Sequence, residues 1–350
     1  MSESITKLTG IAFLAFPEMK ERLFRELSAR FSANFSNYIE YGDLVYCPDW
    51  KLSQGTTKTP FGSYNLPYWS KTTYLEPFKA EFKSIGDAAK LLKNIQRNWA
   101  PYQFTQFRRA ALIQDKLPYI NLKIHTFPCS IPASAIGAYT LLDQNTLIAS
   151  AKTSSYLPAG SFALQEDHEN PPSRAYLKLE EALVRASSLG GGCFNLPLES
   201  KGILPQPYSV PLPSKGMRCL DAGGCPGGWT WVLRQLGCDV VAIDRSELAP
   251  SLMNDKHVTF IKHDAFTLTP KELGSFDWVF SDIICYPERL LEWIHMWLDS
   301  GQATNMICTI KMQGEIDWNT IAHFVEIRHS TVMHLNYNKH EFTWIHTLEN

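Results

Sequence analysis

The chain has 350 residues, of which 45% are hydrophobic, 12% aromatic and 19% charged, and its formal net charge is −2 at pH 7. This length is enough for two domains that each bury a core, and the composition is that of a globular soluble protein. The small net charge excludes a general affinity for polyanions. Any contact with nucleic acid must therefore come from a local patch.

Targeting, membrane and metal signals are weak throughout the chain. The apolar run 10–16 is too short for a signal peptide, and charged residues follow it at once. No other apolar run is long enough to span a bilayer. The eight cysteines form no C-x-x-C pair, most lie in apolar runs, and the ten histidines show no ligand spacing. We therefore expect a cytoplasmic protein with reduced, mostly buried thiols, no metal and no membrane partner.

Residues 1–153 mix strands with short helices, which predicts a small α+β domain. Pro17 opens a segment with helical apolar spacing, so a helix is expected there. Residues 48–78 are rich in Pro, Gly, Ser and Thr without a sustained period, which predicts a long surface connection. Strands are expected at 11–15, 38–41, 44–47, 120–127, 137–142 and 146–151.

The segment 79–123 is basic, with nine Lys or Arg against three acids, a surplus of six in a chain whose total is negative. Aromatic residues are interleaved with these charges, and that combination suits a phosphate backbone and unstacked bases. The alternative is a pair of helices whose aromatics pack inward while the charges stay in solvent. The candidate RNA contacts are Lys90, Lys93, Arg97, Arg108 and Arg109.

A loop rich in Pro, Gly and acids at 154–172 is the expected domain linker, and 173–350 is the expected second domain. After a helix at 174–186 and a long loop at 189–216, strands alternate with helices. This order predicts a mostly parallel, doubly wound α/β sheet whose closing hairpin makes the last strand antiparallel, a Rossmann-like arrangement typical of class I methyltransferases. Strands are expected near 219–222, 240–243, 258–261, 278–280, 306–310, 332–337 and 342–346.

The run from Cys219 to Thr230 carries a strand into an acid, four glycines within six residues, and then a helix. Cys225 stands where a dinucleotide fingerprint needs glycine, and Pro226 removes an N–H that a pyrophosphate would use. A P-loop is excluded because no Gly-Lys-Ser/Thr follows. S-adenosylmethionine fits what remains, with its amino-acid end at Asp221 and its ribose at Asp244; the alternative is a structural glycine turn.

Five charged residues fall at the predicted carboxyl ends of strands, where open α/β sheets bind their ligands. They are Asp221, Asp244, Asp264, Asp282 and Lys311. We therefore expect these side chains to line one edge of the sheet.

Three stretches, 172–182, 221–230 and 249–253, resemble the bacterial 23S rRNA 2′-O-ribose methyltransferases of the RlmM type, in the FtsJ-like group. The resemblance covers most of 171–350 and implies an RNA-binding domain of the THUMP kind before it. Lys311 is followed by Met312-Gln313 where relatives often have Leu-Pro, and the 189–216 loop is longer than expected. The resemblance implies a catalytic Lys-Asp-Lys-Glu tetrad of Lys178, Asp282, Lys311 and Glu341.

The same resemblance places the cofactor along the glycine turn, with Asp244 at its ribose and Asp264 at its adenine amino group. For Trp229, packing under the sheet is favoured slightly over contact with the methionine end. The expected cofactor contacts are Asp221, Gly223, Cys225, Gly227, Gly228, Trp229, Asp244, Asp264 and Asp282.

The chemistry of a ribose 2′-hydroxyl calls for alignment and removal of one proton. Lys311 is the candidate base, and its pKa would have to fall from about 10.4 toward roughly 7–8, through burial and the neighbouring Lys178. Asp282 and Glu341 would orient the two ammonium groups, but carboxylates alone raise a lysine pKa, so the sequence leaves the direction of the shift open.

We therefore expect an S-adenosylmethionine-dependent RNA 2′-O-methyltransferase, with large-subunit rRNA as its substrate and a cytidine as its target, both implied by the resemblance. An RNA-binding module that keeps cofactor binding without turnover is the alternative. An NAD-dependent oxidoreductase is disfavoured by Cys225 and Pro226.

Overall fold

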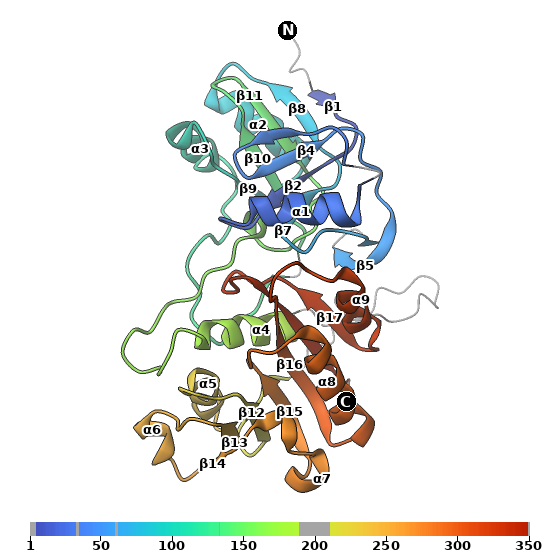
Figure 1. Cartoon of the computed structure of the whole chain (residues 1–350). Coiled ribbons are helices and arrows are strands. Elements are labelled where there is room, and N and C mark those ends of the chain that lie inside the picture. The colour runs from blue at the N-terminus through green and yellow to red at the C-terminus, as the bar shows by residue number, and fades with distance from the viewer. Residues whose placement is uncertain (1–4, 33–34, 60–61, 133, 189–210, 349–350) are drawn as a thin grey trace, which may run out of the picture. The chain divides into compact units, whose positions relative to one another are not determined.

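The computed structural model describes residues 5–32, 35–59, 62–132, 134–188 and 211–348 (Figure 1). Its internal contacts divide the chain into two compact units, one of Met1–Ile124 and Ile131–Ala163, the other of His125–Ser130 and Leu164–Asn350. The change of unit between Ala163 and Leu164 falls inside the segment expected as a linker. The division into independent domains at 153 and 173 stays a prediction.

The first unit contains a five-stranded sheet in the order β1-β8-β11-β10-β9. The β9–β10 pair is parallel and the other neighbours are antiparallel. Helices α2 and α3 pack on each other, and Leu92 and Trp99 are buried in the core beneath them. The elements are β1 (Ile5–Lys7), β8 (Phe78–Glu81), α2 (Ile85–Ile95), β9 (Trp99–Pro101), α3 (Phe107–Gln114), β10 (Gly137–Leu141) and β11 (Thr146–Ser150).

A second sheet of this unit has the order β3-β4-β2-β7, and a separate hairpin joins β5 and β6. Helix α1 buries Leu23 and Leu27, and its buried Glu26 accepts the backbone N–H groups of Tyr68 and Trp69 at 2.9 and 3.1 Å. The elements are β2 (Ile11–Ala15), α1 (Lys20–Arg30), β3 (Ile39–Tyr41), β4 (Leu44–Cys47), β5 (Gln54–Thr59), β6 (Gly62–Tyr64), β7 (Ser70–Tyr74) and the 3₁₀ turn η1 (Pro158–Gly160).

Two predictions for this unit were wrong. The segment 48–78, expected as a connection, contains β5, β6 and β7, whose threonine-rich sequences lack an apolar period although β-branched side chains suit strands. The strand expected at 120–127 is absent, and only His125 makes an isolated bridge, to Leu164. Its apolar side chains Leu122 and Ile124 are exposed, so alternation alone did not supply a partner strand.

The second unit is built on a seven-stranded sheet in the order β14-β13-β12-β15-β16-β18-β17. The strands from β14 to β16 run parallel, while β18 is antiparallel to both of its neighbours. The predicted doubly wound sheet and its antiparallel closing strand are therefore confirmed. The strands are β12 (Arg218–Ala222), β13 (Asp239–Asp244), β14 (Val258–Lys262), β15 (Phe276–Ser281), β16 (Ala303–Lys311), β17 (Ser330–Met333) and β18 (Glu341–Thr347).

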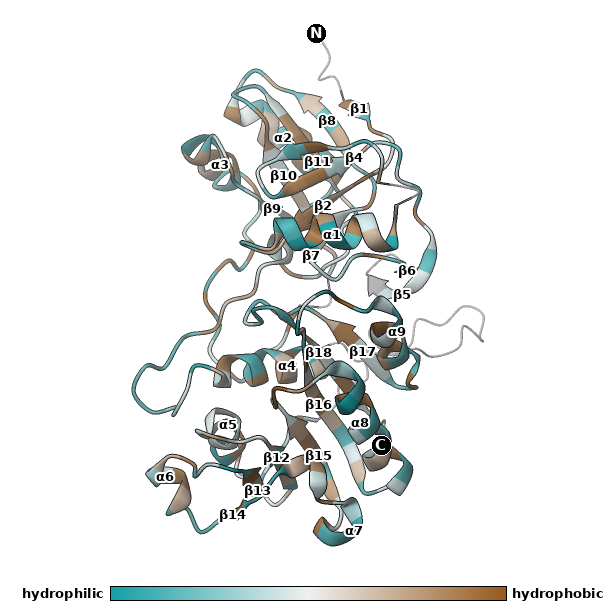
Figure 2. Cartoon of the chain, in the orientation of Figure 1, coloured by the Kyte–Doolittle hydropathy of each residue, from teal (hydrophilic) through white to brown (hydrophobic). Residues whose placement is uncertain are grey.

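Helices pack on this sheet in two sets. Helix α4 contacts α5 and β18, and α5 contacts β12 and β13, whereas α8 contacts β16 and α9 contacts β17. The strands between them are hydrophobic, as the colour of β13 shows (Figure 2), because both faces of a parallel sheet are covered. The helical elements are α4 (Tyr176–Ser188), α5 (Gly228–Gln235), α6 (Pro250–Met253), η2 (Ala265–Thr267), α7 (Pro270–Leu273), α8 (Pro287–Ser300) and α9 (Trp318–Glu326).

Candidate active site

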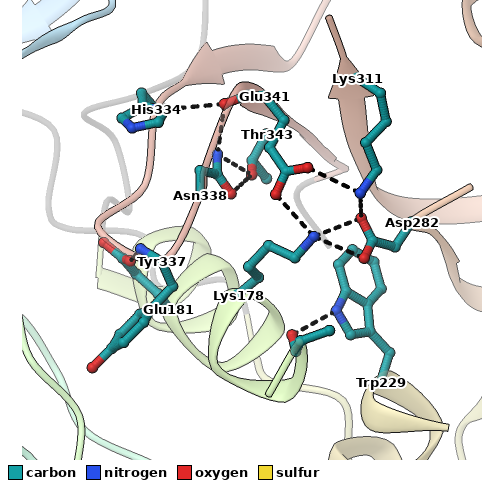
Figure 3. A network of polar contacts seen from close by, with 11 residues as sticks. Lys178, Glu181, Trp229, Asp282, Lys311, His334, Tyr337, Asn338, Glu341 and Thr343 are labelled. Atoms are coloured by element: carbon teal, nitrogen blue, oxygen red, sulfur yellow. Dashed lines mark hydrogen bonds and ion pairs between the residues drawn. The ribbon is translucent and has the colours of Figure 1, made fainter. Parts of the chain in front are cut away.

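The four residues of the expected tetrad lie together at the carboxyl edge of the second unit's sheet (Figure 3). Lys178 comes from α4, Asp282 follows β15, Lys311 ends β16 and Glu341 begins β18. The Lys178 ammonium lies 2.8 and 2.7 Å from the two Asp282 oxygens and 2.9 Å from Glu341 Oε1. The Lys311 ammonium lies 2.6 Å from Asp282 Oδ1 and 2.9 Å from Glu341 Oε2. The result is a closed square in which cations and anions alternate.

The backbone fixes two corners of this square. Lys311 and Glu341 are directly opposite each other in the antiparallel β16–β18 register. The Glu341 carbonyl oxygen accepts from Asn338 Nδ2 at 3.2 Å and lies 3.0 Å from His334 Nδ1. Asn338 also bonds Thr343, so the turn before β18 is tied to the strand that follows it.

Helix α4 fixes the position of Lys178 from the other side. Three residues after Lys178, the fully buried Glu181 accepts hydrogen bonds from the backbone N–H of Tyr337 at 3.1 Å and from the Asn336 side-chain amide at 2.9 Å. Glu181 also pairs with Arg185 at 2.8 Å. The helix that carries one tetrad lysine is thereby bonded to the turn that carries Glu341. Sequence reasoning missed Glu181, although it stands inside the resembling stretch 172–182.

The charges of the square shift the pKa values of Lys311 and Asp282. Burial alone would lower the pKa of Lys311, but the carboxylates of Asp282 and Glu341 outweigh it and the pKa is raised. Burial opposes ionisation of Asp282, yet Lys178 and Lys311 hold the pKa of Asp282 below its usual value. Of the two opposing influences on the Lys311 pKa, burial and the neighbouring carboxylates, the carboxylates of Asp282 and Glu341 therefore prevail in this arrangement.

Asp221 lies at the end of β12 and is almost fully buried. Its Oδ2 accepts the Thr230 hydroxyl at 2.6 Å, whereas its Oδ1 has no hydrogen-bond partner among the described residues. Burial raises the pKa of Asp221 to about 6, with the nearby Asp282 and Asp244 adding to the rise. A buried carboxylate oxygen without a donor favours a cationic ligand group at this point.

The glycines of the turn are required by close packing as well as by backbone angle. Gly223 and Gly227 have φ of +82° and +117°. A Cβ on Gly223 would lie 2.2 Å from Ile283, one on Gly227 2.2 Å from Leu252, and one on Gly228 2.5 Å from the Ser173 hydroxyl. These three glycines are thus explained by contacts within the protein, and their role toward a cofactor stays a prediction.

Trp229 packs as the favoured interpretation predicted. Its buried ring meets Phe280 edge-on at 6.2 Å, and its Nε1 donates to the Ala175 carbonyl at 3.0 Å. The side chain lies beside Lys178 and Asp282 (Figure 3).

The two further acids of the edge differ in their surroundings. Asp244 ends β13 and accepts the backbone N–H groups of Cys225 at 3.0 Å and Ser246 at 2.9 Å. Asp264 accepts the Phe266 N–H at 3.0 Å and pairs with Arg245. Burial opposes ionisation of Asp264, but these partners lower its pKa, so the Asp264 carboxylate at the sheet edge is ionised and paired with Arg245.

Most charged side chains of the basic segment 79–123 are exposed. Lys90 and Lys93 lie on the exposed side of α2, and Arg97 and Arg108 are exposed, while the Arg109 guanidinium stacks 5.5 Å from the Phe82 ring. Of the interleaved aromatics, Phe82 and Trp99 are buried and Tyr102 and Phe104 are half-buried, so the choice between RNA contact and inward packing stays open. The exposed ones are Phe107 and Tyr119.

Several expectations concern the whole chain. In the part of the chain that the structure describes, no helix is long and apolar enough to cross a membrane, and no cluster of three His, Cys, Asp or Glu side chains could hold a metal ion. The seven described cysteines are free, and five of them are buried. Most of the 189–216 loop, residues 189–210, lies outside the described residues.

With the seven-stranded sheet and its charged edge established, the fold of the second unit is that of a class I methyltransferase domain. Residues 171–295 match the family model of FtsJ-like methyltransferases. The predicted resemblance to this group is thereby confirmed.

Curated relatives carry a more particular name, Ribosomal RNA large subunit methyltransferase M. The chain is 34% identical to the one from Alkalilimnicola ehrlichii over 43% of this chain and 37% of that protein. It is 28% identical to the one from Xanthomonas axonopodis pv. citri over 67% of this chain and 58% of that protein. The chain thus spans only part of the length of these relatives.

Among solved structures, a TehB-like SAM-dependent methyltransferase from Corynebacterium glutamicum is 16% identical, with a TM-score of 0.28 over 38% of this chain and 80% of that one. This likeness is too distant to place any site.

Proposed function

We propose that the protein uses S-adenosylmethionine to methylate a ribose 2′-hydroxyl in large-subunit rRNA, with a cytidine as the target nucleotide. The observation that carries this proposal is the closed Lys178-Asp282-Lys311-Glu341 square beside the Asp221 turn. The match of 171–295 to FtsJ-like methyltransferases and the names of the curated relatives support the reaction and the substrate class.

The edge of the sheet fits this cofactor. The unpartnered Oδ1 of Asp221 would accept the ammonium of its amino-acid end, and Asp244, half-buried at the end of β13, would accept its ribose diol. When bound, the cofactor supplies a methyl group on a sulfonium, which is a good electrophile. The protein's own task is then to align the 2′-hydroxyl and to take its proton.

We assign removal of the proton from the ribose 2′-hydroxyl to Lys311. The raised pKa of its ammonium means that Lys311 is a cation at neutral pH, so it accepts a proton only after releasing one. Approach of a ribose hydroxyl into the square would have to loosen the contacts of Lys311 with Asp282 or Glu341. Lys178 holds the same two carboxylates from the other side and keeps the square in place.

An exposed apolar segment directly after Asp282 suits an unstacked base. Ile284 and Tyr286 are 79% and 63% exposed, whereas Cys285 between them is buried and anchors the segment. Because aromatic side chains stack on unpaired bases, we assign Tyr286 to the target nucleotide and the basic residues of 79–123 to flanking RNA.

The test is transfer of labelled methyl from S-adenosylmethionine to rRNA from cells that lack this protein, with wild type, Lys311→Ala and the exposed control Lys256→Ala. We expect label at one ribose for wild type and control, and a loss of at least about a thousandfold for Lys311→Ala with cofactor affinity retained.

The same measurement addresses the second candidate. A fully paired square with a cationic Lys311 is also what a structural salt-bridge cluster would show, which favours an RNA-binding module without turnover. If wild type binds both cofactor and rRNA but transfers no label to naked rRNA or to large-subunit precursor particles, the methyltransferase proposal fails.

A further inference from the structure

A second concave site lies in the C-terminal unit, on the side of α4 away from the tetrad. It is a cavity of about 590 Å³ between the segment 165–170, the start of α4 and Trp231 of α5. This volume lies within the range of pockets for small organic ligands. The lining residues are Thr126, Phe127, Gln165, Glu166, Asp167, His168, Glu169, Asn170, Tyr176, Glu180 and Trp231.

Glu180 is the unusual residue of this cavity. Its side chain lines the cavity although the residue is only 7% exposed, and no described residue forms a hydrogen bond or ion pair with its carboxylate. Burial raises the pKa of Glu180 to about 7, and nearby Asp167 adds to the rise. A nearly buried carboxylate without a partner is costly, and a cationic ligand would remove that cost.

The other acids of the lining leave a net negative charge. Glu166 is neutralised by Arg174, which bonds it at 3.0 and 2.6 Å. Asp167 accepts three donors from Glu169 and Asn170, and these hydrogen bonds lower the pKa of Asp167, so it is ionised. No Lys or Arg is among the lining residues; Arg174 lies next to the lining but is paired with Glu166, and His168 is the histidine of the lining.

Aromatic rings complete the walls. The rings of Tyr176 and Trp231 meet edge-on at 5.5 Å, and Phe127 lies on the opposite segment of the lining. Carboxylates with aromatic faces attract organic cations, which gain both an ion pair and cation–π contact. An inorganic cation is a poor fit, because the described residues contain no cluster of three metal-binding side chains.

We propose that this cavity binds an alkylammonium group, with Glu180 pairing with its nitrogen and Trp231 and Tyr176 enclosing its carbon chain. The proposal is independent of the methyl transfer reaction, because the side chains of Glu180 and Lys178 project from α4 about 200° apart. Two sources share this chemistry, a free amine and the side chain of a lysine in a protein.

The test is calorimetric titration of the full chain with 1,4-diaminobutane in one arm and Nα-acetyl-lysine amide in the other. We expect saturable binding of at least one probe, and weakening of at least about tenfold in Glu180→Gln. Tighter binding of the diamine would indicate a free amine, and tighter binding of the lysine derivative a protein partner.

Two further variants secure the interpretation. Glu247→Gln removes an exposed acid of the same unit and should leave binding unchanged. Trp231→Leu keeps every charge and should weaken binding several-fold. Binding should also be tighter at pH 8 than at pH 6, because Glu180 ionises in that interval. The other titratable or charged groups around the cavity are Asp167, His168, Glu169, Tyr176, Cys129 and the Glu166–Arg174 pair.

Equal affinity in wild type and Glu180→Gln, or no binding of either probe up to 10 mM, a concentration on the order of the weakest specific affinities, would overturn the proposal. Thermal unfolding of each variant shows whether it folds. Should Glu180→Gln fail to fold, Trp231→Leu decides on its own.

Discussion

Lys178 and Glu180 stand two positions apart on α4 and meet opposite conditions. Lys178 faces two carboxylates that are each shared with a second lysine, so every charge of the tetrad has two partners. Glu180 faces a cavity in which its carboxylate has none among the residues that the structure describes. The difference shows that burial by itself does not decide a charge's state. The charges of the tetrad stabilise one another, whereas burial raises the pKa of Glu180 and so favours its neutral form until a cationic ligand pairs with it.

The largest expected effect tests whether Lys311, although paired with two carboxylates, acts as the base. If Lys311 must release a proton before it can accept one, single-turnover methyl transfer should accelerate about tenfold per pH unit between about pH 6.5 and 8.5, because the Lys311 pKa lies above this range. Cofactor binding measured over the same interval is the control. A flat profile with unchanged cofactor binding would remove Lys311 from the proton-transfer step.

Asp221 is the site's counterpart of Glu180, a buried carboxyl with one oxygen lacking a donor. Asp221→Asn should weaken binding of S-adenosylmethionine by roughly 10- to 100-fold, because a neutral amide replaces a charge-assisted acceptor. Wild-type affinity should itself decline as pH falls through about 6, where the raised pKa of Asp221 protonates it. The control is Asp239→Asn at the opposite end of β13, and equal losses in both variants would contradict the assignment.

The exposed cations of the first unit give a smaller, salt-dependent effect. Replacing Lys90, Lys93 and Arg97 together by Gln should raise KM for RNA several-fold and reduce the slope of log affinity against log salt by about two, since each phosphate contact on a single strand contributes roughly 0.7. Replacement of Lys256, Lys262 and Lys271 removes the same charge from the other unit. A matching loss there would show a general charge effect rather than an RNA-binding surface.

The smallest expected effect is the contribution of the Glu180 carboxylate to the pH dependence of stability. Because the pKa of Glu180 is raised from 4.5 to about 7, the folded state holds its proton more tightly and wild type loses stability as pH rises through this interval. Glu180→Gln has no such loss, so its Tm should equal that of wild type near pH 5 and exceed it by about 2–8 °C at pH 8. Calorimetric unfolding measures the difference, and a Tm gap independent of pH would mean that Glu180 is not strained.

The sequence predicts the second unit better than the first for a physical reason. Near-continuous apolar runs are what buried parallel strands look like, and β12, β13, β15 and β16 each contain such a run leading to a charged residue. In the first unit, β7 buries Thr72, Thr73 and Tyr74, whose polar atoms made the segment read as a loop. The strand expected at 120–127 had the right alternation but no neighbour to pair with.

At the site, residue types and positions could be anticipated, and energetics could not. The four tetrad residues were named from the resemblance, yet the sign of the Lys311 pKa shift depends on two oxygens at 2.6 and 2.9 Å, which only the structure provides. The turn glycines suggested approach by a ligand, whereas the structure shows Ile283, Leu252 and Ser173 against them. The isolation of Glu180 has no signature in the sequence, because it is the absence of a contact.

The distribution of thiols provides the protein with two built-in reporters. Cys225 is half-buried at the glycine turn that we propose holds the cofactor, where its N–H bonds Asp244, and Cys129 is half-buried near Glu180, while the other described cysteines are buried. Burial raises the pKa of both thiols, so a maleimide or iodoacetamide probe should label them slowly at neutral pH and faster under alkaline conditions. With Cys193, which lies outside the described residues, replaced by Ser, protection of Cys225 would report occupancy of the cofactor turn and protection of Cys129 occupancy of the acidic cavity. One mass-spectrometric footprint would then monitor both sites in the same sample.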